Sequence, residues 1–339
     1  MSGARRPPLP SHTSPTGGVA VDLRSRLSLL TALLAGLVIA CGGGNVTPTP
    51  TATPTPAPAS PTAPPAFPLT VSDQDGKPLT WTAPPKAIVS YSPGVTEILF
   101  AIGAGSQVIA ADQFSDYPAE AKALKQRVKY TSPDPEGTLA LNPDLVILTR
   151  AQRTSVERFR SAGLPVFYTP EPDSLDAIVE SVRMWGRITG HVEQADRVAS
   201  DMRIRIDAVK AKVAPVTEGP RVYYELSDSL FSVGDRTFIG SMIALLKAKN
   251  VATGSATDFP QLTAEAVISR DPQVILLADA SSANQSLETL KKRPGWTSIS
   301  AVKEGKVHAV DPDIGNRPGP RIVLALEEIG RLLYPDRFR

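Results

Sequence analysis

Two stretches of the chain repeat the same order of polar and apolar positions. They cover residues 136–148 and 265–277, and each begins with a glutamate, Glu136 or Glu265. Apolar residues at helical spacing follow, then an Asn-Pro or Asp-Pro step, then a run of Val, Ile and Leu. Proline ends helices, and a short unbroken apolar run is typical of a buried strand. The repetition predicts two lobes built alike, each with one carboxylate at the start of a helix.

Strands and helices alternate around both copies. Ser92-Pro93-Gly94 has the composition of a turn, and Gly103 and Gly105 end the first predicted helix. Alternation of this kind favours a mostly parallel sheet covered by helices. The predicted strands are 87–91, 108–111, 145–148, 166–168, 222–226, 274–277 and 307–310, and the predicted helices are 97–102, 155–162, 238–249 and 321–333.

The segment 174–214 contains neither proline nor a strand pattern. Two helices fit there, Leu175–Ile188 and Val192–Ala214, with a break near Gly190. The second is long enough to form a stiff connection between the lobes. The predicted fold class is α/β, with two similar three-layer α/β lobes joined by one long helix and a ligand cleft between the lobes. The predicted boundaries are 67–172 for the N-terminal lobe, 173–214 for the helical segment and 215–339 for the C-terminal lobe.

The start of the chain predicts export. Arg24 and Arg26 precede an apolar run over 27–40, and Cys41 follows directly. A basic flank, a short apolar core and small residues before a cut are typical of a secretory signal, so residues 1–40 are predicted to be a signal peptide. The last residues before and including Cys41 resemble the bacterial lipobox, which implies a lipoprotein lipidated on the Cys41 thiol. The alternative is a plain signal peptide or short anchor with an incidental cysteine.

Cys41 is the only cysteine of the chain, so the exported part is predicted to have no intrachain disulfide. Residues 41–66 consist mainly of Gly, Thr, Pro, Ala and Ser. Such a segment has no apolar surface to bury, and it is predicted to be a disordered Pro/Thr-rich tether between a membrane surface and the globular lobes.

Charge and motif content exclude several function classes. The chain has 36 Lys and Arg against 34 Asp and Glu, and no basic patch of the kind that binds nucleic acid. Beyond the predicted signal the only histidines are His191 and His308, and no HExxH, CxxC or Gly-x-Ser-x-Gly motif occurs. The sequence therefore predicts a protein that is not an enzyme, that has no cofactor and that holds no metal directly.

Four segments carry a resemblance to a known family. They are 91–105, 114–121, 141–147 and 317–322, and they resemble the helical-backbone periplasmic binding proteins, which deliver cobalamin, ferric siderophores or heme to ABC importers. The resemblance covers residues 85–335. Ser115-Asp-Tyr-Pro118 and the pair Asp313 and Arg317 are most similar to the cobalamin-binding branch.

The resemblance implies a role for the two repeated glutamates. Glu136 and Glu265 match the positions where the family places one carboxylate on each lobe to meet arginines of the permease. An arginine–carboxylate pair is charge-assisted, and two of them fix orientation as well as position. The alternative is that each glutamate only stabilises the first turn of its helix, where the helix dipole favours a negative charge.

The resemblance also implies the ligand site. Phe114, Tyr130, Phe231 and Phe259 fall in predicted loops, at positions where cobalamin binders set aromatic rings against the corrin plane. Flat rings suit a large, flat ligand whose apolar area provides most of the binding. The alternative is that each ring packs only on its own lobe. Thr149, Tyr130 and Phe259 depart from the pattern, because they stand where a familiar cobalamin binder has Trp residues, and this leaves room for another corrinoid or chelate.

Asp313 and Arg317 would hydrogen-bond the polar edge of the ligand, as the matching pair does in the cobalamin branch. Arginine only donates and ionised aspartate only accepts, so together they could bind both ends of an amide. The alternative is a mutual surface salt bridge. Arg321 is predicted to be a structural residue at a helix start, and Trp81, Trp185 and Trp296 are predicted to be packing residues.

Taken together, the chain is predicted to be a monomeric substrate-binding lipoprotein on the extracytoplasmic face of the cell membrane, in the periplasm or at the cell surface. It would capture cobalamin or a related corrinoid and deliver it to an ABC permease with its ATPase. One alternative keeps the fold and changes the ligand to a ferric siderophore or heme. The other is a surface sensor or interaction lipoprotein without a permease.

Overall fold

The computed structural model describes residues 67–339, which fall within one compact unit. The predicted signal peptide, the lipidation site Cys41 and the tether lie outside the described residues. Between residues 67 and 339, no helix combines the length and the apolar character that a membrane crossing requires.

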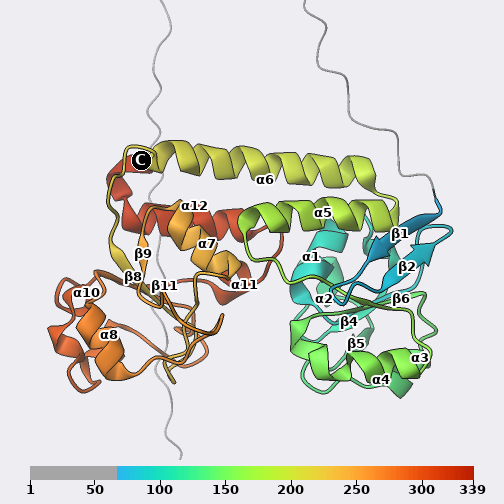
Figure 1. Cartoon of the computed structure of the whole chain (residues 1–339), viewed down its shortest axis with the longest axis horizontal. Helices are drawn as coiled ribbons and strands as arrows, with labels where there is room; N and C mark the ends of the chain where they lie inside the picture. Colours follow the sequence, from blue (N-terminus) through green and yellow to red (C-terminus); the bar gives the residue numbers. More distant parts are fainter. Residues whose placement is uncertain (1–66) are drawn as a thin grey trace, which may run out of the picture. The chain divides into compact units, whose positions relative to one another are not determined.

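The N-terminal lobe is built on a five-stranded parallel sheet with helices on both faces (Figure 1). Neighbouring residues of a strand face opposite clusters: Ile147 packs with α1 (Pro93–Ala101) and α5 (Leu175–Thr189), and Val146 packs with α4 (Val156–Ser161). This alternation produces three layers. The strands, in sheet order, are β5 (Gln126–Val128), β4 (Val108–Asp112), β3 (Ile88–Ser90), β6 (Leu145–Leu148) and β7 (Val166–Tyr168). The helices are α1 (Pro93–Ala101), α2 (Ala119–Lys122), α3 (Pro135–Leu139) and α4 (Val156–Ser161).

The C-terminal lobe repeats the plan with a four-stranded parallel sheet. Leu276 and Ile275 again face opposite clusters, so this lobe also has three layers. The strands, in sheet order, are β11 (Val307–Ala309), β10 (Val274–Leu277), β8 (Arg221–Glu225) and β9 (Lys249–Asn250). The helices are α7 (Phe238–Leu245), α8 (Ala264–Arg270), α9 (Leu287–Lys291), α10 (Ser300–Lys303), α11 (Pro312–Gly315) and α12 (Ile322–Leu333). Two similar three-layer lobes are therefore confirmed, whereas their exact boundaries stay a prediction.

The long connecting helix is confirmed as α6 (Val192–Val213), which follows α5 (Leu175–Thr189) after a left-handed turn at Gly190. Its 22 residues span about 33 Å at ~1.5 Å per residue. In Figure 1, α6 runs along the top of both lobes, above α5 on one side and α12 on the other. A Cβ added at Gly186 would come within 2.2 Å of the Ala195 Cβ, so the close approach of α5 and α6 needs a glycine there.

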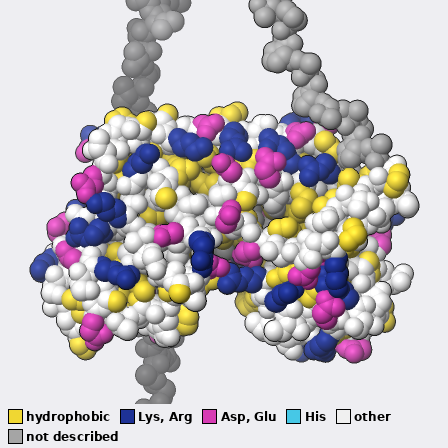
Figure 2. Space-filling model, in the orientation of Figure 1, with side chains coloured by type: hydrophobic (Ala, Val, Ile, Leu, Met, Phe, Trp, Pro, Cys, Tyr) yellow, Lys and Arg dark blue, Asp and Glu magenta, His cyan; other side chains and the backbone are white. Residues whose placement is uncertain are grey.

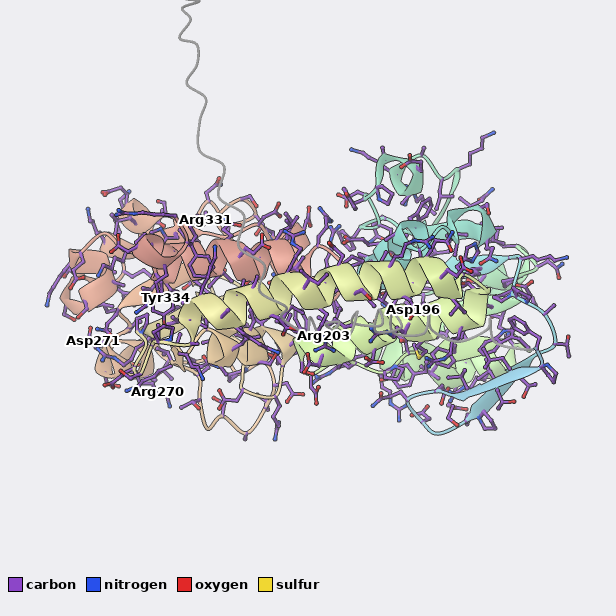
Figure 3. All side chains as sticks on the ribbon, turned by 90° about the horizontal axis from the view of Figure 1, so that it is seen from above. Asp196, Arg203, Arg270, Asp271, Arg331 and Tyr334 are labelled. Atoms are coloured by element: carbon purple, nitrogen blue, oxygen red, sulfur yellow. The ribbon has the colours of Figure 1, made fainter. Side chains whose placement is uncertain are left out.

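Ion pairs hold α6 to both of its neighbours. Figure 3 labels Asp196 and Arg203 along α6, where they pair with Arg183 and Asp176 of α5. Farther along, the Arg205 guanidinium donates two hydrogen bonds of 2.8 Å to the Glu327 carboxylate of α12. The helix therefore connects the lobes through side chains as well as through the chain itself.

A hairpin of β1 (Leu69–Ser72) and β2 (Pro78–Trp81) precedes the first lobe, and the sequence pattern had not predicted it. It brings Trp81 onto Phe167, with ring centroids 6.1 Å apart, and Phe167 packs in turn on Trp185. Trp296 packs edge-on against Tyr223 in the other lobe. All three tryptophans are buried, as predicted for packing residues.

Candidate functional site

A cavity of about 500 Å³ lies between the lobes, with walls from both. A second cavity of about 390 Å³ adjoins it, and the two share Arg150, Glu171, Phe238 and Phe259. Both volumes lie in the range of small-molecule sites. Figure 2 shows charged side chains of both signs gathered where the lobes meet.

The topology explains why the walls are there. Thr149 follows β6 and Leu226 follows β8, so both residues come directly after the carboxyl end of a parallel strand. Residues at this position of an α/β sheet commonly form the ligand crevice. Ser92 follows β3 and caps α1, because its hydroxyl accepts a hydrogen bond from the Val95 N–H. Two sheets with their carboxyl edges turned to the same gap thus make one cleft.

Of the four predicted aromatic residues, three lie at the first cavity or beside it, and Phe231 does not. Tyr130 and Phe259 line the first cavity, from opposite lobes. Phe114 is 47% exposed and packs edge-on against Tyr130, with ring centroids 5.6 Å apart, so it extends the same aromatic wall. Phe231 is 40% exposed and lines neither of the two cavities described above; it forms an isolated backbone bridge with Gln261.

Arg317 lines the first cavity and also joins the lobes. Its guanidinium donates to Asp116 of the N-terminal lobe at 2.6 Å and to Asp313 of its own lobe. The salt bridge between Asp313 and Arg317, which was the alternative to ligand binding, is therefore present, with Asp116 as a third member, and their role toward a ligand stays a prediction. Partial burial works to raise the pKa of Asp116, but the hydrogen bond and charge of Arg317 outweigh it and lower that pKa.

A second arginine joins the lobes beside the first. The Arg321 side chain and backbone N–H donate to the Glu97 carboxylate at 2.9 and 3.0 Å, and the guanidinium lies 3.7 Å from the Tyr117 ring centroid. Glu97 is only 3% exposed, and burial raises its pKa although Arg321 opposes the shift. Arg321 directly precedes α12, as predicted for a structural residue. Its partner was missed, although a lone glutamate inside the apolar helix α1 was a usable signal.

A third cross-lobe pair, also missed from the sequence, lies at the boundary of the two cavities. Arg150 of the N-terminal lobe donates to Asp258 of the C-terminal lobe at 2.8 Å, and its guanidinium lies 5.4 Å from the centroid of the Phe259 ring. Arg236 donates to the other oxygen of Asp258 at 3.0 Å. Glu171 lines both cavities and is open to their solvent, yet the surrounding protein desolvates it and raises its pKa.

Glu136 and Glu265 occupy matching places. Each is exposed in the first turn of a short helix, α3 in one lobe and α8 in the other. In Figure 1 both helices lie on the side of their lobe away from α6. Neither carboxylate forms an ion pair with another residue of the range 67–339. The same range holds no group of three or more His, Cys, Asp and Glu side chains placed to bind a metal.

Comparisons with known proteins agree with this architecture. The family described as "Periplasmic binding protein" matches residues 88–314. The uncharacterized ABC transporter substrate-binding lipoprotein YvrC of Bacillus subtilis is 30% identical over 94% of this chain and 100% of its own length. A cobalamin-binding protein of Halobacterium salinarum is 30% identical over 76% of this chain and 72% of its own.

A solved structure is similar over the same lobes. The periplasmic heme-binding protein RhuT of Roseiflexus sp. RS-1, in its apo form, is 29% identical with a TM-score of 0.66, covering 75% of this chain and 99% of that one. The matched family, the sequence relatives and the two-lobed structure lead to one assignment. The chain is a substrate-binding protein that belongs to the periplasmic binding protein family.

Proposed function

We propose that this protein captures cobalamin or a related corrinoid and delivers it to an ABC permease. The observation that carries the proposal is the cavity between the lobes, in which aromatic rings from both lobes and a polar arginine face one space. The cobalamin-binding relative and the ABC transporter lipoprotein YvrC support the ligand class and the transport partner, respectively.

The wall of the cavity suits a large, flat ligand with a polar edge. Tyr130 and Phe259 offer ring area on opposite sides, and Phe114 extends it. Arg317 uses one N–H for Asp116 and one for Asp313, out of the five that arginine carries. It therefore keeps donors for ligand amides without giving up either partner, which supports the predicted role of Arg317 and leaves Phe231 as the weakest of the proposed contacts.

Delivery to the permease would use the surface of each lobe that faces away from α6. Glu136 and Glu265 are exposed, one on each lobe, on the side away from α6, so a partner with two arginines could meet both at once. Lipidation of Cys41 would keep the protein at the extracytoplasmic membrane surface beside that permease. The function is binding and transfer by a monomer, with no reaction and no cofactor of its own.

Heme is the second candidate ligand, because RhuT shares the fold at 29% identity. Tyr130 is the tyrosine that lines the first cavity, and a tyrosine oxygen binds the iron in some heme proteins. Burial raises the pKa of the Tyr130 hydroxyl, but a bound ferric ion would lower it, so this shift does not separate the two ligands. The corrinoid is our first choice, ahead of heme, a ferric siderophore or a sensor role without a permease, because relatives at 30% and 31% identity are cobalamin- and vitamin B12-binding proteins.

Calorimetry on the full chain tests the choice. We expect heat of one-to-one binding with cyanocobalamin and with dicyanocobinamide, and weaker or no heat with hemin. Heat with hemin alone would mean that the ligand is heme and not a corrinoid. Binding of a corrinoid without any stimulation of the permease ATPase would instead favour the sensor alternative.

A further inference from the structure

We propose that Arg150 is a movable partition in the cleft, and that a bulky ligand occupies both cavities after the Arg150–Asp258 pair opens. The proposal rests on the proposed function in one respect, since it assumes a ligand too large for the first cavity alone. It assigns a role to Arg150 and Asp258 that neither the sequence pattern nor the family resemblance provides.

The position of Arg150 is the first argument. It is a wall residue of both cavities, together with Phe259, on which its guanidinium stacks. Its ion pair with Asp258 runs from one lobe to the other. The side chain therefore lies across the space that would join the two cavities, and its movement would merge them into one continuous cleft.

The exposure of this pair is the second argument. The Arg150 and Asp258 side chains are 49% and 26% exposed, whereas Arg321 and Glu97 are 18% and 3% exposed. Exposed ion pairs contribute little to stability, because water and salt replace them readily. Among the described cross-lobe pairs, the one beside the second cavity is thus far easier to open than the pair beside α12.

The third argument is that Arg150 and Asp258 each keep another charged neighbour when their ion pair opens. Asp258 keeps its hydrogen bond to Arg236, which belongs to its own lobe. Arg150 keeps the negative charge of Glu171 nearby, since both line both cavities. The departure of Arg150 also frees the face of the Phe259 ring, which a flat ligand can then cover.

The ligand that suits this arrangement is a rigid, flat macrocycle that is too large for the first cavity alone. A compact ligand would fill the first cavity of about 500 Å³ and leave the partition closed. The partition would then delay entry of the macrocycle without holding it in place, so its main effect should be on the association rate.

Stopped-flow binding of cyanocobalamin to the full chain tests this role. Arg150→Ala and Asp258→Asn should each raise the association rate by about two- to fivefold, the factor expected from removing one exposed ion pair. Added salt should raise the wild-type rate toward that of the variants, because salt screens the pair. Both variants should lose this salt response.

Arg221→Ala is the matched control. Arg221 forms an ion pair with Asp271 of its own lobe, both side chains are 40% exposed, and Arg221 lines neither cavity. The association rate of this variant should match that of the wild type. If Arg150→Ala leaves the association rate unchanged, or mainly speeds dissociation, Arg150 is not a partition, and the second result would make it a ligand contact.

A crystal structure of the complex gives an independent check. The ligand should contact residues of both cavities, with Arg150 away from Asp258; a ligand confined to the first cavity beside an intact pair would overturn the proposal. Hemin serves as the probe in both experiments if cyanocobalamin does not bind, in which case only the corrinoid assignment fails. Binding of neither would overturn the proposed function and the partition together.

Discussion

On one side of the cleft Arg321 meets Glu97, and on the other side Arg150 meets Asp258. Both are arginine–carboxylate pairs between the lobes, but their surroundings differ. Beside the first pair the backbones touch, because a Cβ at Gly94 would lie 3.0 Å from the Pro318 carbonyl oxygen. Beside the second lie the two cavities. The same chemical pair can thus fix one side of a cleft and leave the other side free to open.

The largest expected effect is on stability at the buried side. Glu97→Ala should lower the free energy of unfolding by about 3 kcal/mol, the low end of the range for breaking a buried pair, since Arg321 keeps some exposure. Arg150→Ala should lower it by about 1 kcal/mol or less. Denaturant unfolding of both variants measures the difference, and equal losses would remove the contrast between the two sides.

Ligand affinity should depend on Arg317, which lines the first cavity between these two sides. Arg317→Ala should weaken corrinoid binding by about 1–3 kcal/mol, the usual cost of losing a hydrogen-bonded partner in a desolvated site. Calorimetry checks this, with Arg221→Ala as the control that removes an arginine outside both cavities. If Arg317→Ala reduces stability but leaves affinity intact, Arg317 serves only to join the lobes through Asp116.

The contrast could be predicted only in part from the sequence. Unbroken apolar runs at 145–148 and 274–277 predicted two buried strands, and the absence of proline over 174–214 placed α5 and α6 within one residue of their ends. These features are local. The partners Glu97 and Arg321 are far apart in the chain, so only the folded lobes bring them together. The β1–β2 hairpin was missed because its short strands are half-exposed and carry Pro78.

Substitution of Glu136 and Glu265, which lie on neither side of the cleft, should leave ligand binding unchanged. The double variant Glu136→Ala and Glu265→Ala should bind ligand within about twofold of the wild type, because both residues start helices on the far surface of their lobes. Stimulation of the permease ATPase in proteoliposomes should fall, and the wild-type stimulation should weaken as salt screens the exposed charges. A double variant that docks normally but fails to bind ligand would contradict this assignment.

The smallest effect should be a difference in pH dependence between the two pairs. Hydrogen bonds from Arg150 and Arg236 lower the pKa of Asp258, so its contribution to stability is complete above its ordinary pKa of about 3.8 and is lost as the pH falls through the lower folded value. The stability difference between the wild type and Asp258→Asn should therefore shrink in that acidic window.

Glu97 should respond in the opposite sense and at higher pH. Burial raises its pKa above about 4.5, so the folded state binds a proton more tightly than the unfolded state. Its contribution to stability should increase as the pH falls from neutral through the folded pKa toward 4.5. Denaturant midpoints for the wild type and Glu97→Gln, measured at steps from pH 7 to 4.5, should diverge in favour of the wild type. Parallel pH profiles would mean that Arg321 cancels the desolvation of Glu97, and the two sides would then differ in exposure but not in their response to protons.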